Sequence, residues 1–358
     1  MIKATLKYLL LCCLPVHSQG LLATTWTVNG SNNSAAQTAT KNITATIQAA
    51  VDKAVPGDAI QLMPGVYFED FHSVRNGLSD KPITIRGVRE SIIKGSGQHS
   101  HVIDINHDYI HLIGFSIDGL TGDAKVKRNY RNKLIYVHGR IPGRGIQGIL
   151  IDTLDLRNAG GECLRLRYFV SDSEIRNTHF TRCGVFDFAF RSSKKNGEGI
   201  YLGTSSTQWG DGKNPTAEPD RSANNWIHHN TFETWGNECV DIKEGAERNI
   251  VEYNICEQQL DPKSAGFDAR GDNNIFRFNT VRGNSGSGFR LGGHKVRGRQ
   301  YGLGNQVYGN AIENNAGGAI KIMATPQGQI CGNHIHQTGT AILRGAYIQN
   351  IHPQASCP

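Results

Sequence analysis

The segment "NECVDIKEGAERNIVEYNICEQQLDPKSAGFDARGDNNIFRFN", residues 237–279, contains the pattern that predicts the fold. Its short apolar runs end in asparagine, and matching runs recur along the chain as "NWIHHN", "NIVEYN", "NIFRFN", "NQVYGN" and "QICGN". The final asparagines are residues 230, 254, 279, 310 and 333, so the steps between them are 24, 25, 31 and 23 residues. A period of this length, without a helical 3.6-residue pattern, is typical of one turn of a solenoid. We therefore expect an all-β, right-handed parallel β-helix in which the asparagines stack as a hydrogen-bonded ladder.

Each turn carries a second short run: "CVDIKEG", "GFDARGD", "GFRLGGH" and "AIKIMAT". Successive side chains of a strand point to opposite faces, so these runs predict inward and outward rows. The inward rows are Val240, Phe267, Phe289 and Ile320, and Ile242, Ala269, Leu291 and Ile322. The outward rows are Asp241, Asp268, Arg290 and Lys321, and beside them Lys243, Arg270, Gly292 and Met323. Neighbours in a row are one strand spacing apart, ~4.8 Å, so we expect a dense charged patch on this face.

The N-terminal segment has lysines, then an apolar run, then small and polar residues, which predicts a secretory signal peptide over residues 1–20. No later segment has the length of a membrane span. Residues 46–54 predict a short amphipathic helix that covers the open end of the coil. Residues 203–225 are polar and rich in turn residues, and we interpret them as a loop beside the charged face. We expect one domain, residues 24–358.

The composition favours a secreted protein that binds an anionic polymer. The 358 residues carry a formal net charge of +7, which for an exported chain indicates an acidic polysaccharide rather than nucleic acid or a membrane. Three glycosylation acceptors are predicted at Asn29, Asn32 and Asn42. Cys12 and Cys13 lie in the predicted signal peptide, so six of the eight cysteines remain for disulfides. We expect Cys331 to pair with Cys357, and the chain to be a monomer.

The outward charges suit β-elimination from a uronic-acid polymer. That reaction needs charge neutralisation at the C5 carboxylate, a base for the C5 proton and a proton for the leaving oxygen. A lysine among cations can serve as the base and an arginine as an electrostatic clamp, which predicts Lys243 and Arg270 for these roles. Hard oxygen ligands favour calcium, and the candidate ligands are Glu238, Asp241, Asp268 and Glu198. The candidate substrate contacts are Arg290, His294, Lys295, Lys321 and Tyr201, and Tyr201 or Tyr301 can supply the leaving-group proton.

The order of Glu238, Lys243 and Arg270, followed by "SGFRLGG", resembles the chondroitinase B and alginate lyase family of parallel β-helix polysaccharide lyases. The resemblance implies Lys243 as the base, Arg270 as its partner and Glu238 as a calcium ligand. The "DIK" segment is also similar to that of pectate lyases, which implies Asp241 as a calcium ligand. The chain departs from the first family's pattern at Gly236, Glu244 and Gly271.

Other hypotheses remain open. A uronan C5-epimerase shares the proton abstraction but returns a proton instead of expelling the leaving group. An inverting hydrolase that uses Asp241 and Asp268 is less favoured, because carboxylates one strand spacing apart leave little room for the attacking water. A non-catalytic polysaccharide-binding β-helix, with the charges as surface ladders, is the alternative from a different class.

Overall fold

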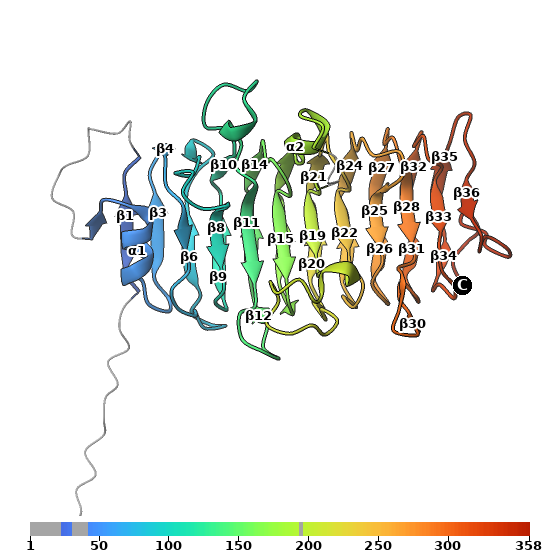
Figure 1. Ribbon diagram of the computed structural model, residues 1–358, viewed down its shortest axis with the longest axis horizontal. Coiled ribbons are helices and arrows are strands. Elements are labelled where there is room, and N and C mark those ends of the chain that lie inside the picture. Colours follow the sequence, from blue (N-terminus) through green and yellow to red (C-terminus); the bar gives the residue numbers. More distant parts are fainter. Residues whose placement is uncertain (1–22, 31–41, 193–195) are drawn as a thin grey trace, which may run out of the picture.

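The computed structural model describes residues 23–30, 42–192 and 196–358 (Figure 1). The predicted signal peptide and the acceptor Asn32 lie outside the described residues. Within those ranges the chain winds into a right-handed parallel β-helix with three long parallel sheets, which confirms the predicted fold. Among the described helices, none combines the length and apolarity needed to cross a bilayer.

The three sheets, A, B and C, run the length of the coil. Sheet A contains, in spatial order, β2 (Ile43–Thr44), β1 (Thr25–Val28), β3 (Ala59–Leu62), β6 (Ile83–Arg86), β9 (Ile110–Ile113), β13 (Leu150–Asp152), β17 (Glu174–Arg176), β20 (Trp226–His228), β23 (Ile250–Glu252), β26 (Ile275–Arg277), β31 (Gln306–Tyr308) and β34 (Ile330–Cys331). Sheet B contains β4 (Gly65–Tyr67), β7 (Ser91–Ile93), β10 (Ser116–Asp118), β14 (Asp155–Arg157), β18 (His179–Thr181), β21 (Thr231–Glu233), β24 (Ile255–Glu257), β27 (Thr280–Arg282), β32 (Ala311–Glu313) and β35 (His334–His336). Sheet C contains β5 (Phe71–His72), β8 (His101–Ile105), β11 (Lys133–His138), β15 (Leu164–Arg167), β19 (Ile200–Leu202), β22 (Val240–Ile242), β25 (Ala265–Ala269), β28 (Ser287–Leu291), β33 (Ile320–Ile322) and β36 (Leu343–Gly345).

Smaller elements lie at the turns. The strands β12 (Ile146–Gln147) and β16 (Val170–Ser171) pair in parallel, and β29 (Lys295–Val296) and β30 (Arg299–Gln300) form an antiparallel hairpin. The helical segments are α1 (Ile47–Lys53), α2 (Val185–Phe188), η1 (Lys127–Asn129) and η2 (Ser206–Gln208).

The predicted inward rows form the core of the coil. Phe267 pairs in register with Val240 and Phe289, and Phe289 pairs with Ile320, and all four side chains are fully buried. The rings of Phe267 and Phe289 are neighbours in the core, with centroids 5.6 Å apart and planes tilted by 39°. Because a one-residue slip would turn these rows outward, core burial also sets the register of the charged rows.

The predicted asparagine ladder is present at the corner between sheets A and B. The backbone N–H and the side-chain amide of Asn230 both donate to Oδ1 of Asn254, at 2.9 and 3.0 Å. The same pair of bonds links Asn254 to Asn279, Asn279 to Asn310 and Asn310 to Asn333. Two ladders that we did not predict run parallel to it: Asn225, Asn249, Asn274 and Asn305, and Gln259, Asn284, Asn315 and Gln337. These bonds satisfy buried polar groups at corners where sheet pairing is interrupted.

The ladder also explains the sharp bend of the chain. The residue before each ladder asparagine adopts the left-handed conformation, with φ of 55° at His229, 54° at Tyr253 and 56° at Phe278. This conformation is unfavourable for bulky side chains, by roughly 1–3 kcal/mol. The paired amide bonds of the following asparagine hold it at every turn.

Both ends of the coil carry the features that we predicted. Helix α1 begins after Thr46, whose side chain accepts a hydrogen bond from the Ala49 N–H at 3.1 Å, and it packs on β1, β2, β3 and β5. At the other end the disulfide between Cys331 and Cys357 confirms the predicted pairing. Two further disulfides join Cys163 to Cys183 and Cys239 to Cys256.

Candidate active site

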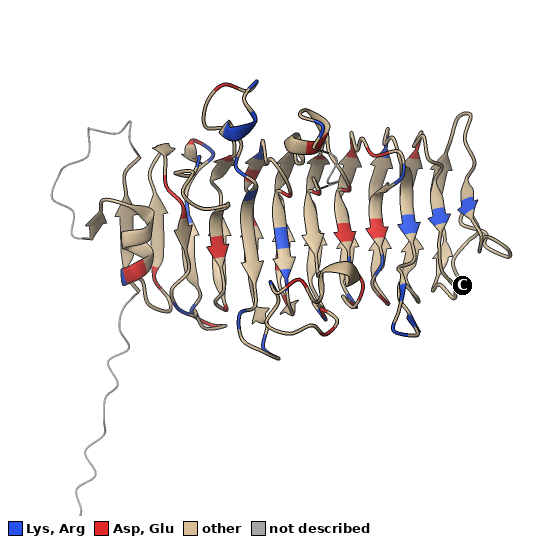
Figure 2. Ribbon diagram, in the orientation of Figure 1, with Lys and Arg blue, Asp and Glu red and all other residues tan. Residues whose placement is uncertain are grey.

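The outward face of sheet C carries a polar residue at the same register position on each strand from β8 to β36, and Figure 2 shows the charged members of this row in red and blue. The register of the strands aligns Asp104, Tyr136, Arg165, Tyr201, Asp241, Asp268, Arg290, Lys321 and Arg344. This confirms the predicted alignment of Asp241, Asp268, Arg290 and Lys321 and extends it in both directions. Negative charge is concentrated on β22 and β25, and positive charge on β28, β33 and β36.

Lys243 follows β22 and is buried beside the acidic part of the row. Its ammonium group pairs with the Asp241 carboxylate and lies 4.2 Å from the centroid of the Tyr201 ring. Burial lowers the pKa of Lys243, but Asp241, Tyr201 and Glu198 together outweigh burial and raise the pKa above its usual value, with Asp241 contributing most. The ion pair therefore holds the proton on Lys243 in this arrangement.

Asp268 is enclosed by two arginines. The guanidinium of Arg270 donates from Nε to Asp268 Oδ2 at 2.9 Å and lies 3.8 Å from Asp241 Oδ2. Arg290 also pairs with Asp268, and its Nη2 lies 3.3 Å from Glu238 Oε1. Burial raises the pKa of Asp268, but the two arginines outweigh it and bring the pKa well below its usual range. Asp268 thus positions the cations.

Three of the four predicted metal ligands converge. Glu198, Glu238 and Asp241 each offer a carboxylate oxygen within 4.8 Å of the others, and we call these residues the acid group. All three are buried, and among the residues that the structure describes, Glu238 Oε2 and Asp241 Oδ1 have no hydrogen-bond partner. Burial and the neighbouring carboxylates raise the pKa of Glu198 to about 7 and that of Glu238 to about 8. Unpartnered carboxylate oxygens are the ligands that calcium prefers, so the acid group fits a divalent cation. Asp268 is not part of it.

The predicted substrate contacts occupy different positions. Arg290 and Lys321 lie in the outward row, but Tyr201 is almost wholly buried. His294 lies at the hairpin β29–β30, with Nδ1 3.0 Å from Glu244 Oε1, and Lys295 is exposed on β29. Tyr301 is also buried, and its ring packs edge-on against Trp209.

Sequence reasoning missed a second charged group beside Tyr201. The Arg165 guanidinium lies 4.1 Å from the Tyr201 ring centroid and donates to Glu162 Oε1 at 2.8 Å. Lys133 Nζ also lies 3.1 Å from Glu162 Oε2. The alternating "LRLR" of β15 was the available signal, but this part of the chain lacks the asparagine runs that set the register elsewhere.

The loop over residues 203–225 borders the site, as predicted. The Ser206 N–H donates to Glu244 Oε2 at 3.1 Å. Gln208 Oε1 accepts hydrogen bonds from Arg165 at 3.0 Å and from the Tyr201 hydroxyl at 3.3 Å. The loop therefore builds one wall beside Lys243 and Tyr201.

The fold is shared with solved structures of carbohydrate-active enzymes. An alginate lyase from Paenibacillus sp. str. FPU-7 superposes with a TM-score of 0.66 and 20% identity over 90% of this chain and 98% of its own. The pectate lyase Pel9A superposes with a TM-score of 0.57 and 12% identity, over 93% of this chain and 81% of its own. The GH136 lacto-N-biosidase from Eubacterium ramulus superposes with a TM-score of 0.57 and 15% identity, over 90% of this chain and 65% of its own. No protein-family model and no curated protein sequence matches the chain. At these identities the likeness shows a common parallel β-helix.

Proposed function

We propose that the protein is a secreted lyase that cleaves a uronic-acid polysaccharide by β-elimination. The observation that carries the proposal is the position of Lys243 and Arg270 beside the acid group on one face of sheet C. The similarity of the fold to alginate and pectate lyases supports the class of reaction. Three disulfides support an oxidising, extracellular location.

Lys243 acts as the base that removes the C5 proton. The neutral amine is needed for this step, so the ion pair with Asp241 must open. Asp241 belongs both to that pair and to the acid group. It therefore links the protonation of Lys243 to the charge of the acid group. Arg270 stays charged and stabilises the negative charge that develops on the substrate carboxylate.

The remaining predicted residues bind and protonate the substrate. Tyr201 contacts Lys243, and burial raises the pKa of its phenol, which keeps the proton needed by the leaving oxygen. Arg290 and Lys321 extend the positive row along the axis and attract further carboxylates of the polymer. His294 and Lys295 border the site from the hairpin.

The acid group is the proposed calcium site, with Glu198, Glu238 and Asp241 as ligands. Calcium bound there would supply positive charge to neutralise the uronate carboxylate. Asp268 was also predicted as a ligand. We propose a positioning role for it instead, because Arg270 and Arg290 both pair with its carboxylate.

The test is ultraviolet absorbance of the unsaturated product during incubation with alginate, pectate, glucuronan and a chondroitin polymer, with calcium and with EDTA. A rising signal with one polymer is the expected result. A flat trace on every polymer overturns the lyase proposal. In that case proton exchange at C5 in D₂O, followed by NMR, identifies an epimerase, and binding without exchange identifies a non-catalytic protein.

A further inference from the structure

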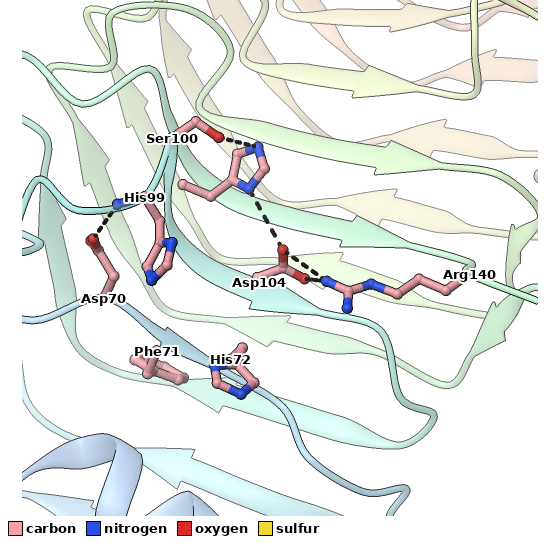
Figure 3. A pocket seen from close by; sticks show the side chains of 8 residues that line it. Asp70, Phe71, His72, His99, Ser100, Asp104 and Arg140 are labelled. Atoms are coloured by element: carbon pink, nitrogen blue, oxygen red, sulfur yellow. Dashed lines mark hydrogen bonds and ion pairs between the residues drawn. The ribbon is translucent and has the colours of Figure 1, made fainter. Parts of the chain in front are cut away.

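A pocket lies on the same face of sheet C, near the end covered by α1 (Figure 3). It has a volume of about 390 Å³ and is lined by residues of β5 and β8 and of the turns next to β5, β8 and β11. Figure 3 shows Asp104 and Arg140 on one side and Asp70 and His99 on the other, with Phe71 below. The pocket shares no residue with the acid group or with the Lys243 pair.

Asp104 presents an ionised carboxylate to this pocket. Its Oδ1 lies 3.1 Å from His138 Nε2, and Arg140 Nη2 donates to both of its oxygens at 3.3 Å. Burial raises the pKa of Asp104, but hydrogen bonds from His101 and His138 outweigh it, and the pKa falls well below its usual range. The Asp104 side chain is still 22% exposed and that of Arg140 56%, so both can contact a ligand.

The charges of the pocket favour hydroxyl groups over carboxylates. Arg140 balances Asp104, and Arg131 pairs with Asp70 at 3.0 Å. Burial lowers the pKa of His101, which favours its uncharged form. An acceptor and a planar donor side by side match two adjacent hydroxyls of a pyranose ring. In a uronate ring the C2 and C3 hydroxyls lie on the edge opposite the C5 carboxylate, so this edge can enter while the carboxylate stays outside.

The pocket is aligned with the candidate active site. Asp104 pairs with Tyr136, Tyr136 with Arg165, Arg165 with Tyr201 and Tyr201 with Asp241. Four strand spacings separate Asp104 from Asp241, roughly 19 Å. Lys133 and Arg165 lie between them and share the single carboxylate of Glu162, which leaves one positive charge along the path. An oligosaccharide of a few rings spans this distance.

We propose that the pocket is a remote sugar-binding subsite, in which Asp104 and Arg140 hold the vicinal hydroxyls of one pyranose ring while Lys243 and the acid group engage another ring of the same chain. The inference rests on the proposed function for the class of polymer. It predicts that affinity depends on chain length, because short oligosaccharides occupy only the region around Lys243.

The experiment compares two pocket variants with two matched controls. The pocket variants are Asp104→Asn and Arg140→Ala. The controls are Asp155→Asn and Arg89→Ala at sheet B. They alter a pair of a buried carboxylate and an exposed arginine that lie 3.6 Å apart. Arg140 is mostly exposed, so its variant tests the site even where Asp104→Asn fails to fold. The probes are the four polymers named above and size-fractionated oligosaccharides of each.

We expect both pocket variants to raise KM for long chains roughly tenfold, the loss typical of a hydrogen bond to a charged group. The shortest cleaved oligosaccharides and both controls should be unaffected. An unchanged KM for long chains, or an equal loss at every length, overturns the subsite and leaves the lyase intact. Where no polymer is cleaved, affinity electrophoresis in gels containing each polymer gives the same comparison. If the pocket variants are then retarded less than the controls, the subsite is supported although the lyase proposal has failed. If the pocket variants and the controls are retarded equally, the subsite is overturned as well.

Discussion

The ammonium group of Lys243 and the carboxylate of Asp241 form an ion pair on the outward side of β22, with only 6% and 0% of their side chains exposed. A pair this deeply buried is costly to break from either side, because the remaining partner becomes an isolated buried charge. The pair also decides how Lys243 titrates, since Asp241 raises the lysine pKa that burial alone would lower.

Lys243→Arg separates the charge of this residue from its function as a base. Arginine retains the positive charge and the pair with Asp241 but cannot release its proton. We expect lyase activity to fall by about 10²–10⁴, the usual contribution of a general base, with little change in the melting temperature. Activity close to that of the native protein would show that Lys243 has only an electrostatic role.

Asp241→Asn should destabilise the fold. The substitution leaves the Lys243 ammonium buried without its carboxylate, and we expect a loss of about 3–5 kcal/mol in the free energy of unfolding. Urea denaturation measures it. The matched control is Lys321→Ala on the same face, which should change stability by no more than ~0.5 kcal/mol. A small effect at Asp241 would mean that the pair is open to solvent.

The acid group should make stability depend on pH and on calcium. The pKa of Glu198 is raised to about 7 and that of Glu238 to about 8, from an ordinary 4.5. Above pH 4.5 the folded protein therefore holds protons that the unfolded chain has lost. The contribution of these two glutamates to the stability of the fold is complete below pH 4.5 and is lost as the pH rises through 7 and 8.

In EDTA, the melting temperature should therefore fall between about pH 5 and pH 9, and calcium should restore it most strongly at the alkaline end, where the ligands are deprotonated. Thermal unfolding monitored by circular dichroism provides the measurement. Glu238→Gln should flatten the pH dependence and weaken the calcium effect. A calcium effect that Glu238→Gln leaves unchanged would place the ion elsewhere.

The asparagine ladder should contribute strongly to stability. Asn254→Ala removes bonds to both Asn230 and Asn279 and leaves the Asn230 N–H without its acceptor in the core. We expect a loss of at least ~2 kcal/mol, since each unsatisfied buried group costs about 1–3 kcal/mol. Chemical denaturation tests this. The control is Arg282→Ala, at an exposed residue one rung away, which should change the free energy of unfolding by no more than ~0.5 kcal/mol.

The in-and-out pattern of the strands was readable from the sequence. The alternation of "VDI" and "GFDA" placed Asp241 and Asp268 outward in one row, and the structure pairs them in register. The sequence pattern could not show that Asp268 pairs with Arg270 and Arg290 instead of joining the acid group. Side-chain partners depend on small shifts between stacked turns, and such shifts leave no trace in the spacing of residues.

The sequence by itself determined the parallel β-helix, the capped end, one asparagine ladder and the charged face, because period and alternation are local properties of the chain. Only the tertiary structure decided which charges meet. Glu198 and Glu238 precede different strands of sheet C, and the close approach of these like charges is imposed by the stacking of the turns. The same stacking buries Lys243 against Asp241 and aligns the distant pocket at Asp104 with them, since core burial fixes the register along the whole axis.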